Sequence, residues 1–490
     1  MIFNHFSKGL KRSALTIALG LCFAGGAQAQ SNVAGTIFGS AEPGSVVTIR
    51  NNDTGMMREI RIDSSGRYRV PQLPIGNYSV TLQKDGRSVA ARENVQVTVG
   101  AGSEVSFAAS DQVLDAIVVT SGSISPVDVS VTDTRVVFTA EQLQKISVDN
   151  NIESVVLLTP GVVQADSRYG NVASFGGSAA SENAFYINGY PVTNPLTNLG
   201  STTLPFDAIG QLQSYIGGYG AEYGRATGGV VNIITKSGTN EWRGGLMATW
   251  SPESLRSTQK DIFYPNAGTA SDGLMYQKLS DREVDELRYG AYVSGPIVQN
   301  RLFVYASGEY TDRDIKTVGT RAAAPATNYR EIDNTLPRWL VKLDWNITDN
   351  HLLELTALSD KSKQDQDHFE YSYTSDTPYV RGNTKNGGYY FEDGGELYIG
   401  KYTGYLTDNL TISALYGEQS QDHISEPWGY DPSQVAVSDN RGGATPVTGL
   451  QNYLQLDYAD AFDKTKSGRF DIDWAVGSHT LRLGYDRHES

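Results

Sequence analysis

The stretch "RWLVKLDWNI", residues 338–347, alternates apolar and polar side chains with the two-residue period of a β-strand. One face carries the apolar members, which are Trp339, Val341, Leu343, Trp345 and Ile347. The opposite face carries Arg338, Lys342, Asp344 and Asn346. The stretch "RFDIDWAVG", residues 469–477, repeats the pattern. Lipid outside and water inside a barrel would produce this alternation, and so would one wet face of a soluble sandwich.

The lengths of the connections between strands favour the barrel. The alternation predicts nine strands: Glu241–Trp250, Leu287–Ser294, Arg301–Tyr310, Pro337–Ile347, His351–Leu358, Glu396–Leu406, Asn409–Gly417, Gly468–Val476 and Thr480–His488. Every second connection is short ("GPIVQN", "TDN", "TD" and "GSH"), whereas the others run 36, 26, 37 and 50 residues. Tight turns at one rim and long loops at the other are typical of outer-membrane barrels. Tilted strands of about ten residues also match the thickness of a bilayer.

Residues 1–29 have the features of an export signal. Basic residues precede an apolar run at residues 14–24, and Ala27-Gln28-Ala29 supplies a cleavage site. Cleavage there would remove Cys22, the one cysteine of the chain, so we expect an exported protein without disulfides. The net charge of −15 argues against nucleic-acid binding. No later run of about 18 apolar residues predicts a transmembrane helix.

Residues 30–110 are predicted to form a small β-sandwich, because short alternating runs are separated by turn residues. Within them, "DSSGRYRVPQLPIGNYSVTL", residues 63–82, resembles the carboxypeptidase regulatory-like, or transthyretin-like, domain. No zinc-ligand spacing accompanies it, so no peptidase activity is implied. We expect an accessory spacer or a weak binding module.

Residues 111–126, "DQVLDAIVVTSGSISP", form a linker with a short apolar segment that favours β-structure. Such a segment can add a strand to a partner's sheet edge through backbone hydrogen bonds. Residues 114–120 resemble the TonB box of TonB-dependent outer-membrane receptors. The resemblance implies that TonB binds Leu114, Asp115, Ala116, Ile117, Val118, Val119 and Thr120.

Residues 127–238 are predicted to form a compact mixed α/β domain. Thr139 with Gln142, and Asn150 with Glu153, are capping signals for two short helices. Asn188-Gly189 predicts a tight hairpin. The stretches "VVLLTPGV", "NAFYINGYPVTNPL" and "LPFDAIGQLQSYIGGYGAEYGRATGGVVNIITKSGTN" resemble the plug of the same receptor family, which makes residues 230–235 the last plug strand.

Two further expectations concern this plug-like segment. A phosphate-binding loop is rejected, because Thr235 precedes Lys236-Ser237 where such a loop needs glycine. Glu222 and Arg225 are charges that a barrel would enclose, so they are candidates for a latch to the barrel wall; a solvated pair in a wet lumen is the alternative.

Residues 239–490 are predicted to form part of a transmembrane antiparallel β-barrel, so the chain is mainly β. The stretch "GAYVSGPIVQNRLFVYASGEY", residues 290–310, resembles the second and third strands of Oar-like TonB-dependent receptors. Plugged outer-membrane transporters of this kind have about 22 strands. Nine strands and no terminal aromatic at Ser490 lead us to expect that the chain is part of a longer protein.

The resemblance implies a receptor or transporter in the cell outer membrane that binds an extracellular ligand and imports it with energy from TonB and its inner-membrane complex. Its partners would be TonB, outer-membrane lipid and that ligand, with the N-terminal domain in the periplasm. The alternative is a secreted or surface protein for carbohydrate binding or adhesion. The ligand stays open among siderophore, carbohydrate and peptide, and an export or adhesion role also stays open.

An enzyme is not predicted, since the chain lacks H-E-x-x-H, G-x-S-x-G and a cysteine nucleophile beyond the signal. No cofactor is predicted either. The acidic stretch "DKSKQDQDHFE", residues 360–370, is expected to be a loop and lacks the spacing of a calcium-binding EF-hand. The histidines after the signal lack ligand spacing, so no metal site is predicted.

Overall fold

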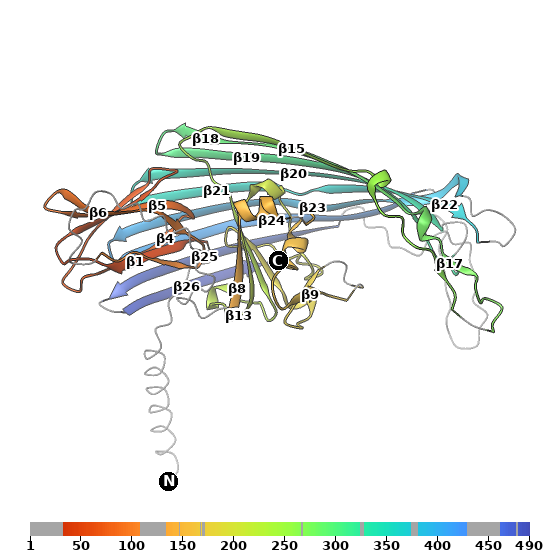
Figure 1. The fold of residues 1–490 in the computed structure, drawn as a ribbon, viewed down its shortest axis with the longest axis horizontal. Coiled ribbons are helices and arrows are strands. Elements are labelled where there is room, and N and C mark those ends of the chain that lie inside the picture. The colour runs from red at the N-terminus through yellow and green to blue at the C-terminus, as the bar shows by residue number, and fades with distance from the viewer. Residues whose placement is uncertain are drawn as a thin grey trace, which may run out of the picture.

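The computed structural model describes residues 33–107, 134–146, 148–166, 168, 172–265, 268–323, 328–373, 381–428, 461–476 and 479–490. Within these residues no helix has the length and apolar character needed to cross a membrane. Three bodies follow one another along the chain: an N-terminal domain (residues 33–107), a plug (residues 134–235) and a large antiparallel sheet, called the wall (residues 243–489). Figure 1 shows the wall as a curved sheet with the plug on its concave side.

The N-terminal domain is a sandwich of two small sheets, as the alternation predicted. One sheet has the order β4-β1-β7 and the other has the order β3-β2-β5-β6. The strands are β1 (Gly35–Ser40), β2 (Val46–Asn51), β3 (Met57–Arg61), β4 (Arg67–Leu73), β5 (Gly76–Lys84), β6 (Arg87–Val97) and β7 (Gly102–Glu104). Their inward side chains, such as Ile37, Val47 and Val80, are buried between the sheets. This burial holds the sandwich together.

The plug combines a five-stranded sheet, in the order β12-β11-β14-β13-β8, with short helices. Its strands are β8 (Thr134–Thr139), β9 (Val162–Gln164), β10 (Ala173–Phe175), β11 (Ala184–Ile187), β12 (Tyr190–Pro191), β13 (Ile209–Gly217) and β14 (Val230–Thr235). Its helices are α2 (Ala140–Lys145), α3 (Ile152–Val156), η2 (Ala180–Glu182), η3 (Phe206–Ala208) and η4 (Ala221–Tyr223). The predicted last plug strand therefore has the expected bounds.

Local sequence signals explain most of the plug's turns and caps. Thr139 and Gln142 form the predicted capping box at α2. Asn188 and Gly189 have φ angles of 49° and 84°, as a tight hairpin turn requires. One cap was assigned wrongly: the side chain of Asn151, not that of Asn150, accepts the Ser154 N–H at the start of α3. The two asparagines are adjacent, and Asn151 has the extended backbone that a cap needs.

The wall contains all nine predicted strands in the predicted order, with β15-β18-β19-β20-β21-β23-β24-β25-β26 as neighbours. Their bounds are β15 (Arg243–Ser251), β18 (Glu283–Val298), β19 (Leu302–Val318), β20 (Tyr329–Thr348), β21 (His351–Ser359), β23 (Arg381–Thr407), β24 (Leu410–Trp428), β25 (Phe462–Val476) and β26 (His479–Glu489). The long connection before β18 carries β16 (Ile262–Phe263), β17 (Met275–Gln277), η5 (Glu253–Leu255) and η6 (Leu279–Asp281). In the described part of the chain β15 and β26 stay at opposite edges, so the sheet does not close into a complete barrel.

One expectation about the wall is wrong. Residues 360–370 are not a loop, because β22 (Ser362–Tyr371) occupies most of that stretch and pairs with both β20 and β23. Several strands also extend beyond their predicted ends; β23, for example, has 27 residues. These extensions lie at the long-loop rim, where polar side chains on both faces hide the alternation that marks the rest of each strand.

The two faces of the wall differ as the alternation predicted. Trp345 and Trp474 are 45% and 49% exposed on the convex face, whereas Lys342 and Thr356 are buried on the face toward the plug. Trp339 and Trp345 are separated by a strand length of about 20 Å, at roughly 3.3 Å per residue. An apolar band of about 25 Å flanked by aromatic girdles is typical of membrane barrels. The convex face is therefore suited to contact lipid.

Candidate functional site at the plug and wall interface

The plug and the wall share one apolar core. Phe185, Ile187 and Ile233 of the plug belong to the same buried cluster as Leu340 and Leu358 of the wall. Around this core, however, the inner face of the wall is polar, and its contacts with the plug are mostly hydrogen bonds and ion pairs. These polar contacts fix where the plug sits, because apolar packing alone has little directional preference.

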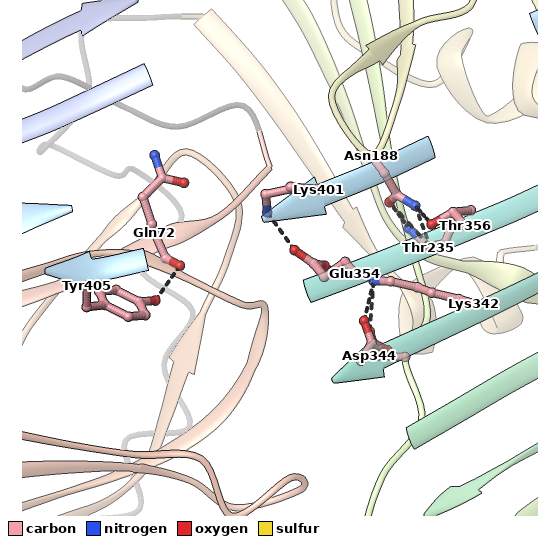
Figure 2. A network of polar contacts seen from close by, with 10 residues as sticks. Gln72, Asn188, Thr235, Lys342, Asp344, Glu354, Thr356, Lys401 and Tyr405 are labelled. Carbon is pink, nitrogen blue, oxygen red and sulfur yellow. Dashed lines mark hydrogen bonds and ion pairs between the residues drawn. The ribbon is translucent and has the colours of Figure 1, made fainter. Parts of the chain in front are cut away.

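A buried charge network holds the end of the plug that leads into the wall (Figure 2). The Lys342 Nζ lies 3.3 Å from the Asp344 carboxylate and 3.2 Å from the Glu354 carboxylate. Lys401 pairs with the other oxygen of Glu354 at 2.7 Å. Two cations thus balance two anions, which offsets the cost of burying them. Lys342 also donates to the hydroxyl of Ser237 at 2.9 Å, directly after β14.

Asn188, in the turn between β11 and β12, hydrogen-bonds to the plug and to the wall. The Asn188 side-chain amide donates to the hydroxyl of Thr235 at 2.9 Å and to that of Thr356, on β21, at 3.1 Å. Its carbonyl oxygen accepts the Thr235 backbone N–H at 3.0 Å. Figure 2 shows this contact beside the lysine and carboxylate network. Asparagine suits the position twice, because it tolerates a positive φ and supplies both a donor and an acceptor.

Two wall carboxylates bind the backbone of one plug loop, residues 202–206. The carboxylate of Asp360 accepts the Thr203 N–H at 2.7 Å, and it also accepts the Gly395 N–H at 3.0 Å. The carboxylate of Glu309 accepts the Phe206 N–H at 3.2 Å. Arg338 donates to the second oxygen of Glu309 at 3.0 Å, which compensates its buried charge. The Thr203 hydroxyl donates to the same Asp360 oxygen at 3.2 Å, so the loop is held through main-chain and side-chain donors together.

Glutamines on β24 complete this loop's attachment. The side-chain amides of Gln419 and Gln421 donate to the Thr202 hydroxyl at 2.7 Å and 3.1 Å. All three residues are buried. The loop thus contacts β19, β24 and the bend between β21 and β22, so it joins wall strands that are far apart in the sequence.

The two predicted latch residues lie on the opposite side of the plug. The Arg225 guanidinium is 3.6 Å from the Asp486 carboxylate on β26, and both side chains are about half exposed. Glu222 meets the wall through its backbone carbonyl, which accepts from Arg469 at 3.4 Å. Arg225 thus forms an ion pair with the wall, whereas Glu222 meets the wall through its backbone carbonyl and through attraction between its carboxylate and Arg469. A latch role for these two residues stays a prediction.

Sequence reasoning placed Lys342 and Asp344 on the wet face of a strand but did not select Glu309, Asp360 or Asn188 as plug contacts. Alternation within β19 could have indicated Glu309, since it follows Phe303 and Tyr305 on the same face. The sequence around Glu309, Asp360 and Asn188 does not indicate which residue each of them contacts across the interface.

Residues 114–120 lie outside the described residues. The described chain stops at Phe107 of the N-terminal domain and resumes at Thr134, the first residue of β8. β8 is an edge strand of the plug sheet and pairs on one side with β13. The linker that carries the predicted box therefore joins the N-terminal domain to an edge of the plug.

Glu153 is a buried acid of the plug, and among the described residues no charged group accounts for its burial. Burial raises the pKa of the Glu153 carboxyl to about 7, and a hydrogen bond from the Ala173 backbone opposes that rise. Among the residues that the structure describes, no group of three histidines, cysteines or carboxylates is placed to hold a metal ion. The carboxylate of Asp360 binds N–H groups of the plug and the wall.

Two protein-family models match the chain in the order of its bodies. The carboxypeptidase regulatory-like domain matches residues 32–110, and the TonB-dependent receptor plug domain matches residues 128–230. The TonB-dependent transporter Oar of Myxococcus xanthus is 29% identical over 317 residues, which cover 62% of this chain and 29% of that protein. Residues 128–230 thus match the plug domain of TonB-dependent receptors, and the chain is similar to members of that family.

Other relatives agree with this assignment. A probable TonB-dependent siderophore receptor, PirA of Acinetobacter baumannii, is 28% identical over 250 residues, covering 46% of this chain and 29% of the relative. The chain thus spans less than a third of the length of either relative. These relatives are a transporter and a receptor, which agrees with the expectation that the chain is not an enzyme. The match to a TonB-dependent receptor plug domain agrees with the predicted location in the cell outer membrane.

The fold also resembles solved structures of receptors. The crystal structure of PirA from A. baumannii has 20% identity and a TM-score of 0.45, covering 72% of this chain and 47% of that one. The outer membrane transporter YddB from Escherichia coli has 16% identity and a TM-score of 0.48, with the same coverage.

Proposed function

We propose that this protein is a TonB-dependent receptor that binds an extracellular ligand and imports it with energy delivered by TonB. The observation that carries the proposal is how the plug is seated: directional hydrogen bonds and ion pairs hold it inside the wall. Each such bond contributes about 0.5–1.5 kcal/mol, or up to about 3 kcal/mol when a charge takes part. A pulling force can therefore break them one after another and release part of the plug.

The proposal assigns a role to each part of the chain. Residues 1–29 are the export signal, 30–110 the periplasmic regulatory-like domain, 111–126 the linker with the TonB box, 127–238 the plug and 239–490 the membrane part. Outer-membrane lipid would cover the exposed convex face, and the lumen would hold the plug. A secreted carbohydrate-binding or adhesion protein has no evident use for the exposed tryptophans of that face.

Residues 114–120 are the proposed contact with TonB, mainly through the backbone of Asp115, Ile117, Val118 and Val119. Ligand binding on the extracellular side would raise the fraction of molecules in which this segment is available. Such a shift requires the ligand to bind the two states with different affinity. TonB, energised by its inner-membrane complex, would then pull on the linker.

The test is Val118→Pro, since proline removes one backbone donor and fixes φ. We expect this variant to lose capture by the purified periplasmic domain of TonB. It should keep normal amounts in the outer membrane. Ser123→Pro, in the same linker but outside residues 114–120, is the matched control and should bind like the unchanged protein. Equal capture of Val118→Pro and Ser123→Pro would contradict the proposed contact.

A further inference from the structure

The N-terminal domain is docked inside the end of the wall where the short turns lie. Figure 1 shows β1, β4, β5 and β6 beside this end of the long strands, opposite β22 and β17. The buried core of the domain includes Leu352 of β21 and Tyr405 of β23, which face the lumen. Two wall side chains thus complete the domain's own hydrophobic core.

Polar contacts also join the domain to the wall. The Tyr405 hydroxyl donates to the backbone carbonyl of Gln72 at 2.7 Å (Figure 2). The Gln72 side-chain amide donates to the Asp473 carboxylate at 2.8 Å. The Arg58 guanidinium lies 4.5 Å above the Tyr405 ring and donates to the side chain of Asn350. Cation–π contacts of this kind are strongest where water is excluded, and Arg58 and Tyr405 are both buried.

Side chains of β13 and β8 in the plug bind the backbone of Val99 and Gly100 in the domain. Gln211 and Gln213 lie two residues apart on one face of β13. The carbonyl of Gln211 accepts the Val99 N–H at 3.1 Å, and the amide of Gln213 donates to the Val99 carbonyl. Arg135 of β8 donates to the neighbouring Gly100 carbonyl at 3.0 Å. Val99 and Gln213 are completely buried, so these bonds are shielded from water.

The docked domain lines the short-turn end of a space beside the plug. A cavity of about 380 Å³ lies between α2, the loop at Phe206 and strands β15, β18 and β19. A second cavity of about 550 Å³ continues toward the short-turn rim, where Asp53 and Asn77 of the domain line it. Ala140, Lys236 and Tyr292 line both cavities, which are therefore neighbours.

We propose that the regulatory-like domain is a gate at the periplasmic mouth, held shut by the plug and the wall. The inference rests on the proposed function, because it assumes that something leaves through this mouth. The linker with the TonB box joins the domain directly to β8. The Val99 and Gly100 contacts join the domain, at one end of that linker, to the plug, at its other end. Tension on the linker would therefore act on these contacts. Release of the domain would thus accompany or precede movement of β8.

The experiment measures access to the wall behind the domain. Leu352→Cys places a thiol under the domain, and Asp349→Cys places one on the exposed turn three residues earlier. Purified full-length protein in detergent micelles, which leave both rims accessible, is treated with a maleimide carrying a 5 kDa polyethylene glycol. We expect the cysteine at 349 to react at least tenfold faster than the one at 352. Equal rates would overturn the gate.

Two sets of variants then test what holds the domain. Gln211→Ala with Gln213→Ala should speed labelling at 352 about tenfold or more, because two buried hydrogen bonds are lost. Gln144→Ala, an exposed glutamine of the same plug, is the control and should change nothing. Tyr405→Phe removes only the hydroxyl that binds Gln72, so it tests the wall side without altering the plug. Unchanged labelling in both test variants would overturn the gate.

The same assay separates the gate from the import mechanism. In energised cells, where a small maleimide such as N-ethylmaleimide replaces the polyethylene glycol reagent, labelling at 352 should fall when TonB is deleted. If the docking variants speed labelling while TonB deletion has no effect, the domain is docked as proposed and the proposed use of TonB is wrong.

Discussion

Removal of the Asp360 carboxylate should free one end of the plug loop. Asp360→Ala eliminates three charge-assisted bonds, from the Thr203 N–H at 2.7 Å, from the Thr203 hydroxyl at 3.2 Å and from the Gly395 N–H at 3.0 Å. Hydrogen bonds to a charged group contribute about 1.5–3 kcal/mol each. Only the two bonds from Thr203 join plug to wall, so local opening of the loop should become easier by at least about 2 kcal/mol. That difference corresponds to roughly a 30-fold larger opening constant.

Hydrogen exchange followed by mass spectrometry measures this opening directly. In the Asp360→Ala variant, the amide of Thr203 should exchange about 30 times faster, while the plug amides of Val231 and Ile233 keep their protection. Asp349→Ala, an exposed aspartate in a short turn, is the control and should have no effect. If Thr203 exchanges within threefold of the unchanged protein, the carboxylate does not hold the loop and the reasoning fails.

Three further predictions follow from individual contacts. Glu153→Gln should remove a pH dependence of stability: the folded chain binds the Glu153 proton more tightly than the unfolded chain, so its stability falls as pH rises from about 4.5 to about 7. In urea titrations the free energy of unfolding of the variant should therefore exceed that of the unchanged protein by on the order of 3 kcal/mol at pH 8, and should equal it at pH 4. Equal urea midpoints of the two proteins at pH 8 would contradict this cost of burial. Asn188→Ala should destabilise the contact between plug and wall by about 2 kcal/mol, because it loses the bonds to Thr235 and Thr356 and places alanine at a φ of 49°. Asn188→Gly also loses the bonds but tolerates this φ, so it should have a melting temperature between those of Asn188→Ala and the unchanged protein. Val341→Arg should cost about 2 kcal/mol of folding into lipid vesicles, because it puts a charge on the lipid-facing side of β20, whereas Asp314→Arg, beyond the apolar band, should fold normally.

The sequence predicted those features that a short segment determines by itself. β20 was recognisable because its apolar face repeats every second residue, and β14 because an apolar run is bounded by glycines and a polar turn. Asn188-Gly189 specified its turn through the positive φ angles that these residues tolerate. The alternation of short and long connections fixed the order of the wall strands.

The features that were missed depend on partners distant in the sequence. β22 is polar on both faces, because it lies beyond the apolar band, so its alternation carried no signal. The contacts of Asp360 with Thr203 and of Gln211 with Val99 join residues more than 100 positions apart. Local patterns contain no information on such pairs. The same limit explains why Glu222 and Arg225 were selected as a latch from charge alone, while the carboxylates that bind plug backbone were not.

The central claim is that the convex face of the wall contacts lipid while the plug fills the concave face. Quenching of tryptophan fluorescence by lipids brominated in their acyl chains tests it most directly, because five tryptophans are exposed in the structure. Four of them lie in strands of the wall: Trp250, Trp339, Trp345 and Trp474; the fifth is Trp242. In reconstituted vesicles, brominated lipid should quench most of the emission, and aqueous iodide should quench little of it. Strong quenching by iodide together with no response to brominated lipid would contradict the account.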